Sequence, residues 1–464
     1  MKKLLLLTFF IITSIVSAQD ITGKWNGMLK FPGQQLRITV EVLKEDTGYK
    51  ALLGSPDQGA GTIPADSFTF ENNVVNFAIA AAGANFKGTY ENGNITGVFN
   101  QSGMSIPLEL TRNEIKAEVV KRPQEPTQPY PYHTEDVTFK NEKGVITLAG
   151  TLTLPKKEGN YPAVILVSGS GAQNRDEEIL GHKPFLVIAD HLTKNGFAVL
   201  RYDDRGVEKS EGNFAAATTA DLATDAEAAF NYLKTRPEIN KKKIGIMGHS
   251  EGGMIAPMVA EKNPDVAFVV MLAGPGITGS EQMVLQNYLV GKGNNIPEDE
   301  LTKISAMNKK MYDAITSEPD TKKMKENVST LIKSEMGSYF ASKGVPQAEI
   351  DNYTNTYVKE VTSPWFVYFL KYDPAPVLEK VKCPILAING DKDVQVAANA
   401  NLDGIKRATE KGGNKKVTTK KLTGLNHLFQ ECTTGQAEEY GEIEQTFSPI
   451  ALTEITTWMK KEIK

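Results

Sequence analysis

Hydrophobic and polar residues alternate with a period of two in the first quarter of the chain. The run 36–43 alternates, as do shorter runs at 68–70 and 74–79, and Asn- and Gly-rich segments separate them. This pattern is typical of strands with one buried face joined by hairpin turns. We therefore predict an all-β domain over residues 19–112, an antiparallel sandwich or barrel. Its aromatic residues are expected in the core: Trp25, Phe31, Phe68, Phe70, Phe77, Phe86 and Phe99.

From Glu135 onward, short apolar runs alternate with segments of helical periodicity. The runs predicted as strands are 137–139, 145–154, 163–167, 197–201, 244–247, 266–272, 383–389 and 416–422. The predicted helices are 183–194, 219–234, 254–260, 397–410 and 450–461. Such alternation is typical of a mostly parallel, doubly wound sheet with helices on both faces. Residues 135–464 are therefore predicted to form one α/β domain.

Two further segments have a composition of their own. Residues 113–134 contain four prolines within 121–133 and are predicted to form an extended, semi-rigid linker, with His133 solvated. Residues 277–381 interrupt the strand–helix alternation and are predicted to be helical, with one apolar stripe at Ile304, Met307, Met311 and Ile315. The stripe is explained first by helix packing. Because an insertion at the C-terminal edge of such a sheet overhangs any site there, the segment is also predicted to be a lid over an apolar pocket.

The N-terminus has the features of a cleavable signal peptide. Lys2 and Lys3 precede the apolar run 4–16, and Ser17 and Ala18 follow it. Residues 1–18 are therefore predicted to be removed, leaving a mature chain that begins near Gln19 and is secreted or periplasmic. The apolar run is too short to span a bilayer, so no stable membrane anchor is expected.

Composition and charge indicate which binding partners and cofactors are not expected. The formal net charge is −4, and 40% of residues are hydrophobic and 23% charged, without a long block of one sign. We therefore expect neither nucleic acid nor an anionic membrane as a partner. The two cysteines and five histidines show no zinc-site spacing, so neither a metal nor another cofactor is predicted. The sequence leaves open whether Cys383 and Cys432 pair and whether the chain forms a homodimer.

The segment 243–256 carries the first candidate for catalysis. Gly248-His-Ser-Glu-Gly252 lies between an apolar strand and a helix and has the pattern G-x-S-x-G. On a strand–turn–helix, this pattern lifts the central serine clear of the sheet, at the positive end of the helix. Ser250 is therefore predicted to be a nucleophile.

A serine nucleophile needs a base, normally histidine oriented by a carboxylate. Where a G-x-S-x-G serine lies on such a strand–turn–helix elbow, the acid and then the histidine follow it in the chain. Among the five histidines only His427 lies after Ser250, in the loop behind the last predicted strand. Asp391 and Asp393 both follow the strand 383–389. We prefer Asp393 as the acid, because it lies beyond the immediate turn, and assign Asp391 to capping that turn.

Acyl transfer also needs hydrogen-bond donors for the oxyanion. The backbone N–H of Glu251, directly after the nucleophile, is one predicted donor. The other is expected from the loop after strand 163–167, where Ser170 is the candidate and Gly171 the alternative. Gly169-Ser-Gly171 could instead cradle a phosphate, but the chain lacks the G-x-x-x-x-G-K-[ST] pattern of a phosphate-binding loop.

With these residues identified, the chain resembles the α/β-hydrolase superfamily, and within it secreted EstD-type carboxylesterases, which are similar to serine aminopeptidase-like hydrolases. The matching blocks are 168–176, 200–206, 248–253, 389–396 and 425–430. The resemblance implies hydrolysis of small-molecule esters with short to medium acyl chains, with Ser250, Asp393 and His427 as triad and no cofactor. One departure is Glu208, where the family usually has glycine, so the backbone of that loop is open to question.

Two other functions remain possible on the sequence. A serine aminopeptidase-like peptidase would need a carboxylate cluster in the lid to hold the ammonium group of its substrate, and the sequence shows no unambiguous one. A non-catalytic protein that binds glycan or lipid on a hydrolase scaffold would be expected to lack a triad member. We therefore predict a serine carboxylesterase that works through an acyl-enzyme.

Overall fold

The computed structural model describes residues 20–31, 34–46, 48–56, 59–79, 83–101, 104–116, 121–342 and 344–463. The chain divides into two compact units, 1–119 and 120–464, and each is described separately. The predicted signal peptide lies outside the described residues. No helix in the described ranges combines the length and the apolar character needed to cross a membrane.

Within its described residues, the N-terminal unit is one nine-stranded antiparallel sheet with the order β4-β3-β2-β1-β9-β8-β7-β6-β5. The strands are β1 (Gly23–Phe31), β2 (Gln34–Glu45), β3 (Gly48–Ser55), β4 (Gly59–Pro64), β5 (Ser67–Glu71), β6 (Val74–Ile79), β7 (Ala84–Glu91), β8 (Asn94–Gln101) and β9 (Met104–Thr111). The all-β prediction for this region is confirmed. The sheet is continuous, so of the two predicted forms the structure favours the barrel over two packed sheets.

The sheet curls so that strands far apart in its order meet. The Tyr49 ring of β3 lies 6.1 Å from that of Phe68 and 6.4 Å from that of Phe70, both on β5. Inside the curl, Phe77, Phe86 and Phe99 occupy paired positions on adjacent strands. The predicted aromatic core is confirmed for the buried side chains of these three residues and of Trp25. Phe68 and Phe70 are half-buried at its edge, and the Phe31 side chain lies outside the described set.

The described part of the second unit contains an eight-stranded sheet with the order β10-β11-β13-β12-β14-β15-β16-β17. Its strands are β10 (His133–Asn141), β11 (Ile146–Leu154), β12 (Tyr161–Val167), β13 (Ala198–Tyr202), β14 (Ile239–His249), β15 (Val269–Leu272), β16 (Ile385–Gly390) and β17 (Val417–Leu422). The β10–β11 and β11–β13 pairs are antiparallel and the others parallel. The prediction of a mostly parallel sheet is therefore confirmed.

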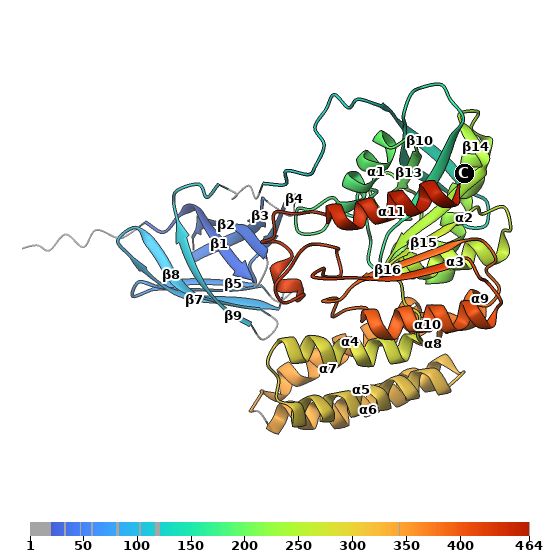
Figure 1. Ribbon diagram of the computed structural model, residues 1–464. Helices are drawn as coiled ribbons and strands as arrows, with labels where there is room; N and C mark the ends of the chain where they lie inside the picture. The colour runs from blue at the N-terminus through green and yellow to red at the C-terminus, as the bar shows by residue number, and fades with distance from the viewer. Residues whose placement is uncertain are drawn as a thin grey trace, which may run out of the picture. The chain divides into compact units, whose positions relative to one another are not determined.

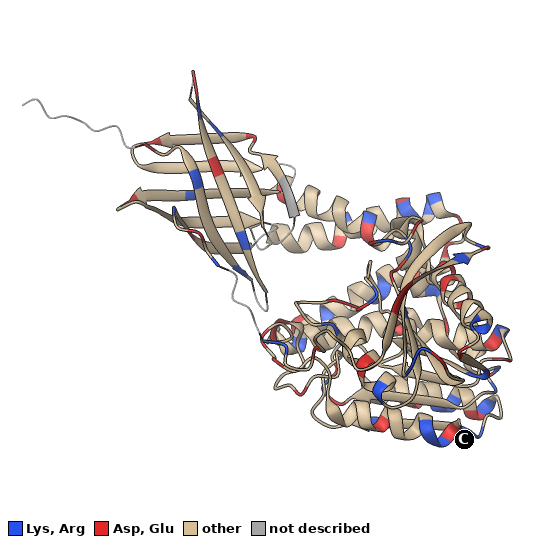
Figure 2. Cartoon of the chain, turned by 90° about the horizontal axis from the view of Figure 1, so that it is seen from above, with Lys and Arg blue, Asp and Glu red and all other residues tan. Residues whose placement is uncertain are grey.

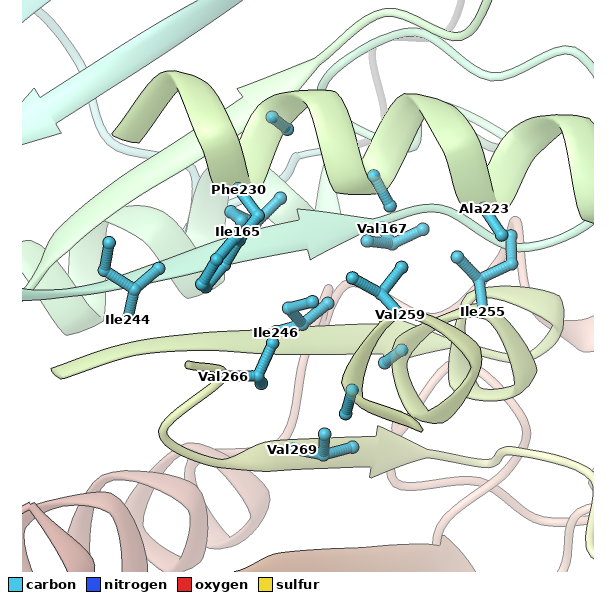
Figure 3. Packing of buried hydrophobic residues seen from close by; sticks show 14 of the residues in the cluster. Ile165, Val167, Ala223, Phe230, Ile244, Ile246, Ile255, Val259, Val266 and Val269 are labelled. Carbon is cyan, nitrogen blue, oxygen red and sulfur yellow. The ribbon is translucent and has the colours of Figure 1, made fainter. Parts of the chain in front are cut away.

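Helices cover both faces of this sheet, as the apolar runs predict (Figure 1). One face packs against α1 (Pro184–Lys194) and α11 (Pro449–Glu462). The other packs against α2 (Thr219–Thr235), α3 (Glu251–Lys262), α9 (Ala375–Leu378) and α10 (Ala398–Lys411). Figure 3 shows Phe230 of α2 over Ile165 of β12 in this second core. The strands are apolar on both sides because both faces are buried.

The predicted insertion is helical. It contains α4 (Gly279–Gly293), α5 (Glu298–Ser317), α6 (Thr321–Ser342), α7 (Gln347–Val361) and α8 (Pro364–Lys371). Met311 and Ile315 of the predicted stripe are buried in a core of its own, which confirms helix packing as their first role. Charged residues of both signs are interspersed along the helices (Figure 2).

The segment before β10 differs from the predicted linker. β10 begins at His133, inside the range 113–134 assigned to the linker. Arg122 donates hydrogen bonds to the carbonyls of Leu180, Gly181, Gly441 and Ile443. Gln124 donates to the Phe447 carbonyl at 2.7 Å. These nonlocal bonds attach Arg122 and Gln124 to the rest of the second unit, which the proline spacing could not indicate.

Candidate active site

Ser250 occupies a strained turn between β14 and α3. Its φ and ψ are 51° and −115°, which a residue with a side chain rarely adopts. A Cβ on Gly248 would overlap the carbonyl of Gly252, and a Cβ on Gly252 would overlap that of Val167. Both glycines of G-x-S-x-G are therefore required by close backbone contact.

The backbone of Ser250 is tied down while its hydroxyl is free. Its N–H donates to the Leu272 carbonyl at the end of β15 at 2.8 Å, and its carbonyl accepts from the Gly253 N–H at 2.9 Å. The Ser250 hydroxyl makes no hydrogen bond to any residue that the structure describes, including His427. The serine is half-buried. Its side chain is thus presented on a rigid support.

His427 is paired with one of the two candidate acids. Its Nδ1 lies 2.8 Å from Asp393 Oδ2, and both side chains are buried. Asp393 Oδ1 accepts the backbone N–H groups of Gln395 and Val396, each at 2.8 Å. Asp391 instead accepts the Gly424 N–H at 2.7 Å, as a turn-capping residue does. The structure therefore joins Asp393, and not Asp391, to the histidine.

His427 and the nucleophile turn meet through His249, the residue before Ser250. The His249 and His427 ring centroids are 4.8 Å apart. His249 Nε2 lies 2.9 Å from the His427 carbonyl oxygen. Because β14, β16 and β17 run parallel, the turns that follow them lie at one edge of the sheet. The structure thus brings Ser250, Asp393 and His427 to the same edge.

The loop after β12 lies against the nucleophile. A Cβ on Gly169 would be 3.2 Å from the Ser250 Cβ. The backbone N–H groups of Ser170 and Glu251 have no hydrogen-bond acceptor among the described residues, and Glu251 begins α3. Free N–H groups at the start of a helix favour a negative charge. Gly171, the alternative donor, has φ 98°, where glycine is favoured.

The Glu251 side chain links the nucleophile turn to the helical insertion. Its Oε1 accepts the Thr219 hydroxyl at 2.6 Å and the Trp365 Nε1–H of α8 at 2.8 Å. Its Oε2 is buried without a partner in the described part of the chain. Burial raises the pKa of this carboxyl above its ordinary value. A half-buried tryptophan of the insertion therefore touches the residue directly after Ser250.

A second buried carboxyl supports the loop after β12. Asp204 accepts the Ser168 hydroxyl at 2.9 Å and the Gln173 N–H at 3.0 Å. Burial raises the pKa of Asp204 to about 8. Nearby, Glu208 has φ 47°, a left-handed conformation that explains why glycine suits its position. Glu208 therefore adopts the left-handed backbone conformation although it is not glycine.

Sequence reasoning missed Glu177. Its Oε1 accepts the Gly169 N–H at 2.7 Å and lies 2.9 Å from His249 Nδ1. It also missed Thr219 and Trp365, which hold Glu251. Glu177 directly follows the block 168–176, which is a weak signal, and no spacing indicates the other two. In the described residues, no three His, Cys, Asp or Glu side chains gather as around a metal ion, and Cys383 and Cys432 are separate free thiols.

Comparison with known proteins finds relatives named as hydrolases. Residues 183–340 match the model of the family described as "Serine aminopeptidase, S33". The chain is 25% identical over 450 residues to Esterase EstD of Thermotoga maritima, covering 96% of this chain and 88% of that protein. It is 33% identical over 128 residues to the uncharacterized protein PA2218 of Pseudomonas aeruginosa, covering 27% of this chain and 32% of the relative.

Among solved structures, the Pyrococcus furiosus esterase Pf2001 superimposes with a TM-score of 0.43 at 17% identity, covering 75% of this chain and 100% of that one. The structure of PA2218 gives 0.44 at 16% identity, covering 75% and 100%. The family model accounts for the region of the α/β unit that contains Ser250. The similarity to Esterase EstD extends along nearly the whole chain. The family model and the similarity to Esterase EstD support an EstD-like α/β-hydrolase.

Proposed function

We propose that the protein is a serine carboxylesterase that hydrolyses short- to medium-chain acyl esters through an acyl-enzyme. The observation that carries the proposal is the strained turn at Ser250 beside the buried Asp393–His427 pair. A serine hydroxyl is weakly nucleophilic until a neighbouring base accepts its proton. The sequence similarity to Esterase EstD along nearly the whole chain supports ester substrates.

In the proposed mechanism, Ser250 Oγ attacks the ester carbonyl carbon while His427 Nε2 accepts its proton. Asp393 holds Nδ1–H, which keeps the lone pair on Nε2 facing the serine and stabilises the imidazolium that forms. The oxyanion is stabilised by the backbone N–H groups of Glu251 and Ser170. The imidazolium then protonates the departing alcohol. Water hydrolyses the acyl-enzyme through the same base and releases the acid.

We further propose that the helical insertion is the lid over the acyl chain. α8 supports this role because it begins with an aromatic segment and because Trp365 bonds Glu251 beside the nucleophile. An apolar surface there would bind the acyl chain and exclude water. The expected acyl preference is therefore set by the residues of α8.

The test is hydrolysis of p-nitrophenyl acetate, butyrate and octanoate by the mature chain and by Ser250→Ala. We expect saturable turnover by the wild type and a loss of at least about 10³-fold in kcat for the variant. The order of the three substrates measures the length of the acyl pocket. Equal rates for both proteins, or no turnover by either, would overturn the esterase proposal.

A peptidase acting on N-terminal residues is the second candidate, because the matching family model is described as serine aminopeptidase. It would use the same nucleophile on an amide. Cleavage of amino-acid p-nitroanilides with a kcat/KM above that for the esters would favour it. Binding of glycan or lipid by residues 19–112, without hydrolysis by the full chain, would favour a binding protein instead.

We also propose export of the chain with removal of residues 1–18. The basic, apolar and small-residue order of the N-terminus supports this proposal. Mass spectrometry of the protein from the culture medium or periplasm should give an N-terminus near Gln19. An intact N-terminus at Met1 in the cell interior would contradict it.

A further inference from the structure

Glu177 and His249 form a buried pair that the proposed mechanism does not use. Glu177 is 4% exposed and His249 is 6% exposed. The carboxylate Oε1 lies 2.9 Å from His249 Nδ1 and accepts the Gly169 N–H at 2.7 Å. On the other side of the ring, His249 Nε2 lies 2.9 Å from the carbonyl oxygen of His427. The pair therefore lies between the loop after β12 and the loop that carries the base.

Both nitrogens of His249 face oxygen atoms that accept hydrogen bonds. The His427 carbonyl has no proton, so Nε2 must donate to it. Glu177 Oε1 accepts the Gly169 N–H and also faces Nδ1, so a carboxylate at Glu177 needs Nδ1 to donate as well. A neutral imidazole has only one N–H, whereas an imidazolium has two. Beside a Glu177 carboxylate, the two contacts therefore fit a positively charged His249.

His182 provides the contrast within the same domain. It is fully buried, and its Nε2 lies 2.8 Å from the Tyr440 carbonyl oxygen and 3.0 Å from Gln430 Nε2, but its Nδ1 lies 3.0 Å from the Thr446 hydroxyl. A hydroxyl can donate to a bare nitrogen, so His182 satisfies its contacts with Tyr440 and Thr446 while neutral. Burial lowers the pKa of His182 to about 4.

The surroundings of His249 favour its charge. The titratable groups that face it are Glu177 from the loop after β12, Asp393 from the turn after β16 and the ring of His427. The other side is apolar: a cavity of about 10 Å³ there is lined by residues that include Phe185, Ile188 and Phe447. Burial lowers the pKa of His249, but the charge and hydrogen bond of Glu177, the His427 carbonyl and the charge of Asp393 together raise it above its ordinary value.

We propose that Glu177 and protonated His249 are a positioning pair that ties the loop carrying Ser170 to the loop carrying His427, so that loss of the His249 proton sets the alkaline limit of activity. The inference rests on the proposed hydrolytic function. A deprotonated His249 can keep only one of its two hydrogen bonds. It then loses either its bond to Glu177, the residue that holds Gly169 beside Ser250, or its bond to the His427 backbone. Because these groups act on the transition state, the loss lowers kcat more than it changes KM.

The proton on His249 can be observed without any catalysis. The mature Ser250→Ala chain, labelled with ¹⁵N-histidine, contains only five histidines, and each signal can be assigned by substitution. At pH 8 we expect two N–H signals from His249, as for an imidazolium, and the two unlike nitrogens of a neutral ring from His182. A neutral tautomer of His249 at pH 7 would overturn the proposal, whether or not the protein hydrolyses esters.

The pH profile of kcat tests whether the His249 proton sets the alkaline limit of activity. For the wild type we expect a rise as His427 deprotonates and a fall at alkaline pH. Glu177→Gln should move the alkaline midpoint down by about one unit or more, since it removes the opposite charge beside His249. Glu178→Gln is the matched control, because Glu178 is the exposed neighbour and, among the described residues, its hydrogen bonds and ion pair are to Asn174 and Lys183.

The outcomes separate this inference from the proposed function. Superimposable profiles for the wild type, Glu177→Gln and Glu178→Gln would overturn the positioning pair, as would an equal shift for both variants. If no ester is hydrolysed by any protein, the esterase proposal fails, and the NMR experiment still decides the charge of His249. If Glu177→Gln does not fold, His249→Gln replaces it and should remove the alkaline limb rather than shift it.

Discussion

The effect of Asp393→Asn on His427 can be predicted from the hydrogen bonds of the individual Asp393 atoms. Asp393 Oδ1 accepts two backbone N–H groups, from Gln395 and Val396, while Oδ2 faces His427 Nδ1. Asparagine has one oxygen and one NH₂ group. Because both backbone donors require the oxygen, the NH₂ group must face His427 Nδ1.

A donor opposite Nδ1 selects the tautomer of His427 that carries its hydrogen on Nε2. That nitrogen then presents an N–H to Ser250 and cannot accept the hydroxyl proton. In a serine protease triad the same substitution lowers kcat by about 10⁴, or about 5 kcal/mol of transition-state stabilisation. We expect a loss of this size in kcat for Asp393→Asn, with KM little changed.

Asp391→Asn is the matched control in the same turn. Within the described part of the chain, the Asp391 side chain accepts the Gly424 N–H alone, and an asparagine oxygen can accept it equally well. Its kcat for p-nitrophenyl butyrate should therefore stay within about twofold of the wild type. Thermal melting of each variant would verify the fold. A kcat for Asp393→Asn above about a tenth of the wild-type value, or an equal loss in Asp391→Asn, would refute the reasoning.

Two further predictions concern the support of the site. Gly248→Ala should cost about 3 kcal/mol in stability and at least about 100-fold in kcat, because its Cβ would overlap the start of α3. Gly337→Ala, whose Cβ would lie 3.6 Å from Ile350, should be no less stable than the wild type in the same thermal melts. The pKa of Asp204 is about 8 in the folded chain, above its value near 4 in the unfolded chain. The contribution of Asp204 to the free energy of unfolding is therefore present below pH 4 and lost as the pH rises through 8. In urea titrations, Asp204→Asn should match the wild type at pH 4 and exceed it at pH 9, by an amount on the order of 5 kcal/mol; lower stability of the variant at pH 9 would contradict this expectation.

Features that depend on neighbouring residues could be predicted from the amino-acid sequence. The apolar runs and the helical segments predicted the sheet of the α/β unit, because a strand buried on both faces must be apolar throughout. Ser250 could be named as the candidate nucleophile because the strand, the two glycines and the helix all lie within about a dozen residues. His427 could be named because the chain contains so few histidines. Both assignments are local or depend on order along the chain.

Contacts between residues far apart in the chain could be identified only from the folded structure. Glu177 meets His249 across 72 residues, and Trp365 meets Glu251 across 114. Asp393 rather than Asp391 reaches His427 because the turn after β16 directs one carboxylate at the Gly424 backbone and the other at the imidazole. Sequence periodicity cannot predict these contacts, because they depend on the order of the strands in the sheet and on which buried polar atoms form hydrogen bonds there.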